Sequence, residues 1–276
     1  MITLTNHRET YRFVPSTSTP VSPERVAQLL KAEWELFTKQ TGKSAEESKR
    51  ALKSLPMGVT SSFQHWDPYP ISIVSAKGAW MTDVDGRQLL DLSMGFGAML
   101  AGHLNPVVVA EVKKALESGT LFVTPSPIST DAAERICRRF GIDQVRFTNS
   151  GTESTMYAVR TARAATDKNA IVKIEGGYHG SYDPFVVSSK PPIDKIGDAE
   201  DPIAYTPEGI VPGEIYVVPY NNADSLERTF KKHGSSIACF ILEPVLENLG
   251  IILPDEGYLE RVRELCDEYN VVLIFD

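Results

Sequence analysis

The apolar run at residues 237–242 (IACFIL) constrains the fold more strongly than any other feature of the chain. It carries no polar alternation, which is typical of a strand whose two faces are both covered by helices. Comparable strand-like runs lie at 144–148, 170–174, 184–188, 214–218 and 270–275, and helix-like stretches lie at 153–165, 223–233 and 257–269. This order predicts an α/β fold, with a mainly parallel sheet and helices on both faces.

An N-terminal segment of different character precedes this pattern. Residues 1–20 have the composition of a loose arm, and Ser22-Pro23 is a typical start for a helix, which we place over 22–40. Two further helices are expected, one that starts at Asn105-Pro106 and runs to about Ser118, and one over 131–140 that Gly141 would end.

A hairpin is expected near the end of this N-terminal segment. The dipeptide Asp85-Gly86 lies between strand-like runs at 80–84 and 87–92, and it favours a two-residue turn. We therefore expect an arm, a helix and a hairpin over residues 1–88, and the sheet domain over residues 89–276.

Charge and cysteine usage argue against several function classes. The chain has 28 Lys and Arg against 36 Asp and Glu, so its net charge of −8 gives no support to nucleic-acid binding. No apolar run approaches the roughly 18 residues of a membrane span, and the N-terminus lacks the apolar core of a signal peptide. The three cysteines form no CxxC pair and the five histidines show no zinc spacing, which favours a cytoplasmic protein with reduced thiols and no metal site.

A glycine turn between a predicted strand and a predicted helix is the clearest candidate for a binding site. Ser150-Gly151-Thr152 follows the run at 144–148 and opens the helical stretch at 153–165. The N–H groups of a first helical turn point outward and the helix dipole favours negative charge, so this turn suits an anion. Gly151 would let a phosphate approach the backbone. Ordinary helix capping is the alternative interpretation.

The last strand-like run ends in a carboxylate, Asp276, that follows apolar residues and needs a partner. A protonated heterocyclic nitrogen would serve, because a neighbouring carboxylate raises its pKa and keeps it protonated. The pyridine of pyridoxal phosphate (PLP) is such a group. Tyr178 could stack on that ring and Val245 could cover its other face. Ligands of open parallel sheets bind beyond the carboxyl ends of the strands, where all these residues are expected to converge.

Four motifs, in this order, carry a resemblance to a known family: VRFTNSGTE at 145–153, IEGGYHG at 174–180, EPVLENLG at 243–250 and LIFD at 273–276. The chain resembles the first part of a class III, fold-type I, PLP-dependent aminotransferase. Within that class it is most similar to the glutamate semialdehyde aminomutase-like group. The resemblance implies that residues 89–276 form the first part of the large PLP-binding domain.

The resemblance also implies roles for individual residues. Asp276 and Tyr178 are the catalytic candidates, the first at the ring nitrogen and the second stacked on the ring. The phosphate would be bound by Ser150, Gly151 and Thr152, the second ring face by Val245, and the phenolic oxygen approached by Asn248; Ser61 and Phe96 match substrate positions, and Glu153, His179 and Glu243 support the site. Turn-forming roles for His179 and Asn248 remain open, and the assignments of Ser61 and Phe96 are open as well.

In the family, the Schiff-base lysine is expected a few dozen residues after the position of Asp276. The sequence stops at Asp276. Lys173 lies inside a predicted strand and is interpreted as structural. We therefore expect the chain to be the N-terminal portion of a longer enzyme, without the rest of the large domain and the small C-terminal domain. As a whole product it is expected to be poorly stable and inactive.

Three functions are compatible with these motifs. The first is a transaminase that moves an amino group between an amine or amino acid and a keto or aldehyde acceptor. The second is an intramolecular aminomutase, disfavoured because Phe96 replaces a Trp-like position of the aminomutase and the surroundings of Ser61 differ. The third is a non-catalytic protein of the PLP fold. The resemblance implies a homodimer.

Overall fold

The computed structural model describes residues 22–198, 200 and 202–276. The chain divides into two compact units between Pro125 and Ser126, here called the N-terminal and the C-terminal unit. The domain boundary expected between residues 88 and 89 falls inside a strand of the N-terminal unit. The expected arm at residues 1–20 lies outside the described residues. No described helix is long and apolar enough to cross a membrane.

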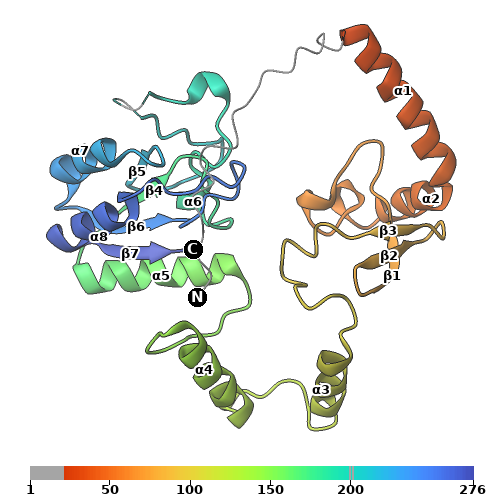
Figure 1. Cartoon of the computed structure of the whole chain (residues 1–276), viewed down its shortest axis with the longest axis horizontal. Coiled ribbons are helices and arrows are strands. Elements are labelled where there is room, and N and C mark those ends of the chain that lie inside the picture. The colour runs from red at the N-terminus through yellow and green to blue at the C-terminus, as the bar shows by residue number, and fades with distance from the viewer. Residues whose placement is uncertain (1–21, 199, 201) are drawn as a thin grey trace. The chain divides into compact units, whose positions relative to one another are not determined.

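The N-terminal unit combines helices with a small antiparallel sheet (Figure 1). The sheet has the order β1-β2-β3. The elements are α1 (Pro23–Gln40), α2 (Gly42–Ala51), the 3₁₀ turns η1 (Pro56–Gly58) and η2 (Ser62–Gln64), β1 (Ile73–Lys77), β2 (Trp80–Asp83), β3 (Gln88–Leu90) and α3 (Pro106–Leu116).

The predicted helix starts and the hairpin are confirmed in this unit, with one correction to the turn. Ser22 caps α1 by accepting a hydrogen bond from the Arg25 N–H. Strands β2 and β3 pair as expected, but the loop between them has three residues, 84–86, because Asp83 pairs with Arg87. Gly86 takes a φ of 88°, as the last residue of such a loop requires.

Helix α2 was not expected, because its sequence is polar throughout. Its N-terminus is held by the carboxylate of Asp85, which accepts hydrogen bonds from the N–H groups of Lys43 and Ser44 and from the Ser44 hydroxyl. The hairpin loop therefore caps a helix that lies about forty residues earlier in the chain.

The C-terminal unit has the predicted α/β architecture. Its sheet has the order β5-β4-β6-β7, and every pair is parallel. The elements are α4 (Pro127–Phe140), α5 (Gly151–Thr166), β4 (Ala170–Ile174), α6 (Asp183–Val186), the 3₁₀ turn η3 (Ile193–Lys195), β5 (Ile215–Val218), α7 (Ala223–His233), β6 (Ile237–Leu242), α8 (Tyr258–Glu268) and β7 (Val272–Phe275).

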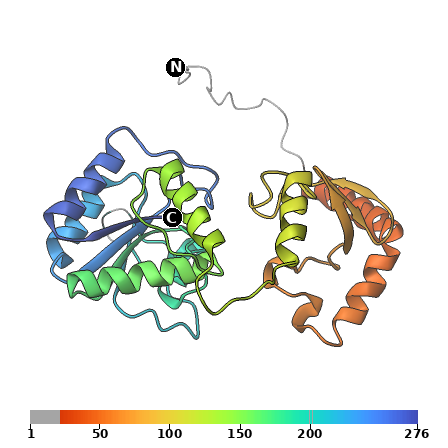
Figure 2. The same ribbon diagram turned by 90° about the horizontal axis from the view of Figure 1, so that it is seen from below.

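Helices cover both faces of this sheet, as Figures 1 and 2 show. On one face, side chains of α7 and α8 such as Phe230 and Leu265 pack with Phe240. On the other face, Val159 of α5 and Phe185 of α6 pack against the sheet. Strands β4 and β6 are buried along their whole length, which is why their sequences show no polar alternation.

Two predicted strands are wrong. Residues 144–148 form no ladder with a described strand, and a groove lined by Arg146 and Thr148 separates the segment from β7. Residues 184–188 were expected to be extended, but α6 occupies 183–186. Pro184 fits the start of a helix, and an apolar run this short does not distinguish the two structures.

Candidate active site

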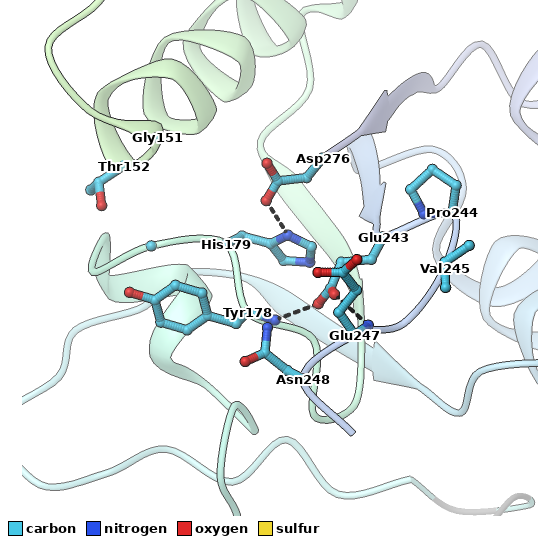
Figure 3. A pocket seen from close by; sticks show the side chains of 11 residues that line it. Gly151, Thr152, Tyr178, His179, Glu243, Pro244, Val245, Glu247, Asn248 and Asp276 are labelled. Atoms are coloured by element: carbon cyan, nitrogen blue, oxygen red, sulfur yellow. Dashed lines mark hydrogen bonds and ion pairs between the residues drawn. The ribbon is translucent and has the colours of Figure 1, made fainter. Parts of the chain in front are cut away.

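A pocket of about 620 Å³ lies at the carboxyl edge of the sheet in the C-terminal unit (Figure 3). The chain leaves β4 toward β5 on one side and later returns past β4 to β6 on the other, so the strand order reverses between β4 and β6. Such a reversal opens the crevice where ligands of open α/β sheets bind. The pocket is lined by Gly151, Thr152, Tyr178, His179, Gly180, Glu243, Pro244, Val245, Glu247, Asn248 and Asp276.

The N-terminus of α5 forms one wall. Ser150 is its N-cap and accepts a hydrogen bond from the Glu153 N–H, at 3.2 Å, while the Glu153 carboxylate accepts from the Asn149 N–H at 2.7 Å. This exchange is close to a capping box, and it fixes the turn that carries Gly151. A Cβ added at Gly151 would meet no atom within 4 Å, so the space in front of the helix is open.

A close contact joins α5 to the loop after β4. Gly180 has a φ of 94°, and a Cβ there would lie 2.4 Å from Thr152 Oγ1 and 2.8 Å from Thr152 Cα. The Ser181 N–H donates to Thr152 Oγ1, and the Thr155 hydroxyl donates to the His179 carbonyl. Glycine is therefore required at position 180 both for its backbone conformation and for the approach of the helix.

Glu243 links the loops that follow β4 and β6. One of its carboxylate oxygens accepts from the Tyr178 N–H at 3.0 Å, and the other accepts from the Glu247 N–H at 2.8 Å. The residue is 8% exposed. This carboxylate therefore sets the position of Tyr178 relative to the loop that carries Val245 and Asn248.

Asp276 is held by a buried histidine. His179 Nδ1 lies 2.7 Å from Asp276 Oδ2, with the imidazole fully buried and the Asp276 side chain 33% exposed. A carboxylate accepts hydrogen bonds only, so we assign the shared proton to Nδ1. Nε2 is buried and has no hydrogen-bond partner. The carboxylate retains acceptor capacity toward the pocket.

The chemistry of these walls fits PLP. The open helix N-terminus at Gly151 offers N–H donors to a phosphate, and Asp276 offers a carboxylate to a protonated ring nitrogen. Tyr178 supplies an aromatic face between them, and Figure 3 shows Thr152, Tyr178 and Asp276 around one opening. The described residues contain no group of three or more His, Cys, Asp or Glu side chains that could hold a metal ion.

The predicted site residues fall into three groups. Eight of them line the pocket: Gly151, Thr152, Tyr178, His179, Glu243, Val245, Asn248 and Asp276. Ser150 and Glu153 support its wall from within the cap of α5. Ser61 and Phe96 belong to the N-terminal unit, where Phe96 lines a separate cavity and its ring lies 6.1 Å from that of Phe63.

The sequence did not lead us to three of the residues that line the pocket, or to the hydrogen bond between His179 and Asp276. Gly180, Pro244 and Glu247 belong to motifs already singled out, so their position beside named residues was an available signal. The hydrogen bond between His179 and Asp276 joins residues 97 positions apart, and no local pattern indicates it.

Residues 62–276 match the family model described as aminotransferase class-III. A glutamate-1-semialdehyde 2,1-aminomutase of Methanocella arvoryzae is 40% identical over 234 residues, which are 84% of this chain and 54% of that protein. The protein of the same name from Nitrosopumilus maritimus is 40% identical over 229 residues, or 82% of this chain and 53% of the relative.

Solved structures agree with this grouping. A glutamate-1-semialdehyde aminomutase from Pseudomonas aeruginosa PAO1 superposes with a TM-score of 0.81 at 26% identity, covering 94% of this chain and 56% of that one. A structure described as a transaminase with PLP bound gives a TM-score of 0.78 at 35% identity, covering 86% and 55%.

The chain spans about half the length of the curated relatives it matches. The family match nevertheless covers most of the chain, including the whole parallel sheet and every residue that lines the pocket. The fold is that of the fold-type I PLP transaminases. The chain belongs to the class III aminotransferase family.

Proposed function

We propose that this chain is part of a PLP-dependent transaminase that moves an amino group between an amine or amino acid and a keto or aldehyde acceptor. The observation that supports this most strongly is the shared pocket of an open helix N-terminus, an aromatic ring and a carboxylate. These three features come from α5, the loop after β4 and the end of β7, and together they match the three parts of the cofactor.

The residues proposed to hold PLP each have a distinct task. The Gly151 and Thr152 N–H groups, with Ser150, bind the phosphate. Tyr178 lies against the ring and Val245 covers the other face, while Asn248 approaches the phenolic oxygen. When bound, PLP supplies an electron sink for the carbanion that amino-group transfer requires.

Asp276 keeps the ring nitrogen protonated, because a nearby negative charge favours the cationic form of a base. His179 donates to the same carboxylate and orients it, and Asp276 lines the pocket with acceptor capacity left. Since His179 has no other hydrogen-bond partner on its ring, we propose that its task is to position Asp276. Glu153 and Glu243 are proposed to shape the site without reacting.

An intramolecular aminomutase is the second candidate. The curated relatives that match at 40% identity carry that name, which favours this reaction. Phe96 and the sequence around Ser61 favour the transaminase, because both differ from the pattern expected of the aminomutase. We propose Ser61 and Phe96 as substrate residues under either reaction.

We further propose a homodimer in the cytoplasm. Support comes from apolar side chains on α1 and α3 that remain exposed within the N-terminal unit, including Leu29, Leu30, Val108 and Val112. An interface between two copies would remove this surface from water.

Cofactor binding tests the proposal directly. We expect Thr152→Ala and Gly151→Asp both to weaken PLP binding, the first by removing a hydroxyl from the phosphate site and the second by placing a negative charge there. Asp276→Asn is expected to retain folding and to lose most of the reaction rate. Unchanged PLP affinity in both phosphate-site variants would contradict the proposed placement.

A substrate panel separates the two reactions. The whole protein is incubated with glutamate semialdehyde in one assay, and with pairs of amines and keto acids in another. Transfer between separate molecules supports the transaminase. Exchange within glutamate semialdehyde without an external acceptor would overturn it in favour of the aminomutase.

A further inference from the structure

Strand β4 contains one cation in an otherwise apolar and fully buried sequence. Its five residues are Ala-Ile-Val-Lys-Ile, and Lys173 is 0% exposed. Within the sheet Lys173 is aligned with Val217 of β5 and Ile241 of β6. A buried ammonium is costly unless it is well bonded, so its partners are informative.

The Lys173 ammonium is surrounded by acceptors from one loop, the segment 177–189 that follows β4. Nζ donates to the carbonyls of Val187 at 2.6 Å, Gly177 at 3.0 Å and Phe185 at 3.3 Å, and it lies 3.3 Å from Ser189 Oγ. Gly177 and Ser189, the first and the last of these acceptors along the sequence, are twelve residues apart. The lysine therefore holds both ends of the segment together.

One peptide group in this segment is fixed from two sides. The Gly177 carbonyl accepts from Lys173, and the N–H of the same peptide group, which belongs to Tyr178, donates to Glu243. A cation from β4 and an anion directly after β6 thus determine the orientation of the peptide that leads into Tyr178 and His179. Neither charged group has to touch the cofactor to affect where these two rings lie.

We propose that Lys173 is a positioning residue for the cofactor site, and that it orients Tyr178 and His179 by holding the ends of segment 177–189. The proposal rests on the proposed PLP function, because it assigns the lysine to the geometry of that pocket. Nζ is engaged by main-chain carbonyls on the α5 face of the sheet, so Lys173 is not a reacting amine.

Charge is consistent with this role. Burial lowers the pKa of Lys173 to about 7, and the carboxylates of Glu243 and Glu175 oppose that change. An amine donates hydrogen bonds in either protonation state, so the segment stays anchored on both sides of neutral pH.

Lys168 is a matched control. Its Nζ also donates to three main-chain carbonyls, those of Gly234, Tyr269 and Asn270, but it lies before β4, at the opposite edge of the sheet from the pocket. Both lysines anchor loops, and only Lys173 anchors the one that carries pocket residues. A general need for lysine anchors would affect both variants alike.

The test measures binding of pyridoxamine phosphate (PMP) to the whole protein, because PMP has no aldehyde and cannot form imines with lysines. We expect Lys173→Met to weaken PMP binding by about tenfold or more, and Lys168→Met to change it by less than about twofold. Lys173→Gln retains two donors and should fall between Lys173→Met and the wild type. The circular dichroism of bound PMP at saturation should change only in the Lys173 variants, because the ring would be oriented differently against Tyr178.

The outcomes distinguish a failure of the proposed function from a failure of the positioning role. If the wild type does not bind PMP, the proposed function is overturned and the positioning role with it. If the wild type binds and Lys173→Met binds equally well with the same dichroism, only the positioning role is overturned. Equal losses in Lys173→Met and Lys168→Met would also overturn it. Should Lys173→Met fail to fold, Lys173→Gln decides, and wild-type affinity and dichroism in that variant would refute the proposal.

Discussion

The two units of the chain are stabilised in different ways. In the C-terminal unit, apolar side chains from both sheet faces are fully buried, among them Phe230 and Phe240 on one face and Phe185 on the other. In the described part of the N-terminal unit, the buried side chains are polar: Thr41, Ser44, Asp83 and Asp91. One unit therefore depends on an apolar core, and the other depends on hydrogen bonds between loops and helices.

These hydrogen bonds explain how the N-terminal unit keeps its shape while exposing apolar surface. Asp91 accepts from the N–H groups of Ser93 and Met94 and lies 2.7 Å from His103, so it connects the two ends of the loop that carries Phe96. The hydrogen bond to His103 lowers the pKa of Asp91. The comparison indicates that the C-terminal unit buries its apolar side chains within itself, whereas the N-terminal unit leaves apolar side chains of α1 and α3 exposed.

The largest expected effect compares the apolar core of the C-terminal unit with an exposed position of the N-terminal unit. Phe230→Ala should destabilise the C-terminal unit by about 3–5 kcal/mol, because it removes a fully buried ring that packs on Phe240 and Tyr269. The comparison change Val74→Ala, at an exposed position of β1, should stay within about 0.5 kcal/mol. Chemical denaturation of each variant measures the change in its free energy of unfolding. Similar losses at the two positions would contradict the contrast.

The buried cation of the C-terminal unit gives a pH-dependent effect. The pKa of Lys173 is lowered to about 7 mainly by burial, while Glu243 and Glu175 raise it. Between pH 7 and the ordinary lysine range the unfolded chain binds more protons, so the stability of the folded state rises with pH, by up to about 4 kcal/mol. Lys173→Met should remove this rise in denaturation curves recorded from pH 7 to 10. The same slope in wild type and variant would show that Lys173 titrates normally.

The next largest effect is expected at the contact between α5 and the loop that follows β4. Gly180→Ala should cost about 2 kcal/mol or more, because the new Cβ meets Thr152 in a backbone conformation with positive φ. Gly151→Ala is the control, since its Cβ meets open space, and its stability should change little. Thermal unfolding distinguishes the two. Equal midpoints for both variants would argue against the close approach of helix and loop.

The smallest effect belongs to the N-terminal unit. The Thr41 hydroxyl donates to the Phe37 carbonyl at 2.6 Å and lies 3.0 Å from the Tyr69 hydroxyl. Thr41→Val removes these bonds with little change in shape and should cost about 1 kcal/mol. Tyr69→Phe, which removes only one of them, should cost less. An N-terminal unit unaffected by Thr41→Val would not depend on buried polar contacts as described.

The sequence predicted the central sheet well, because a strand buried on both faces carries its own signal in consecutive apolar residues. The prediction of a strand at 144–148 was wrong because strand pairing depends on a neighbouring strand and not on the segment alone. Helix α2 was missed because its stabilising cap, Asp85, comes from a distant loop.

The site was predictable to the extent that parallel strands bring their carboxyl ends to one edge. That rule placed Tyr178 and Asp276 together, and Gly151 lines the same pocket although the strand expected before it does not form. It could not show which side chains bond to one another across loops. The pairing of His179 with Asp276 and the anchoring role of Lys173 depend on how the segment after β4 turns back on itself.

The central claim is that the pocket of the C-terminal unit holds the phosphate at one end and a protonated ring nitrogen at the other. Equilibrium titration of the wild-type chain and Asp276→Asn with PMP, and with pyridoxamine, which lacks the phosphate, tests both ends at once. We expect the wild type to bind PMP at least about tenfold more tightly than pyridoxamine, and Asp276→Asn to weaken the binding of both ligands. Equal affinity for the two ligands, with no effect of Asp276→Asn, would contradict the claim.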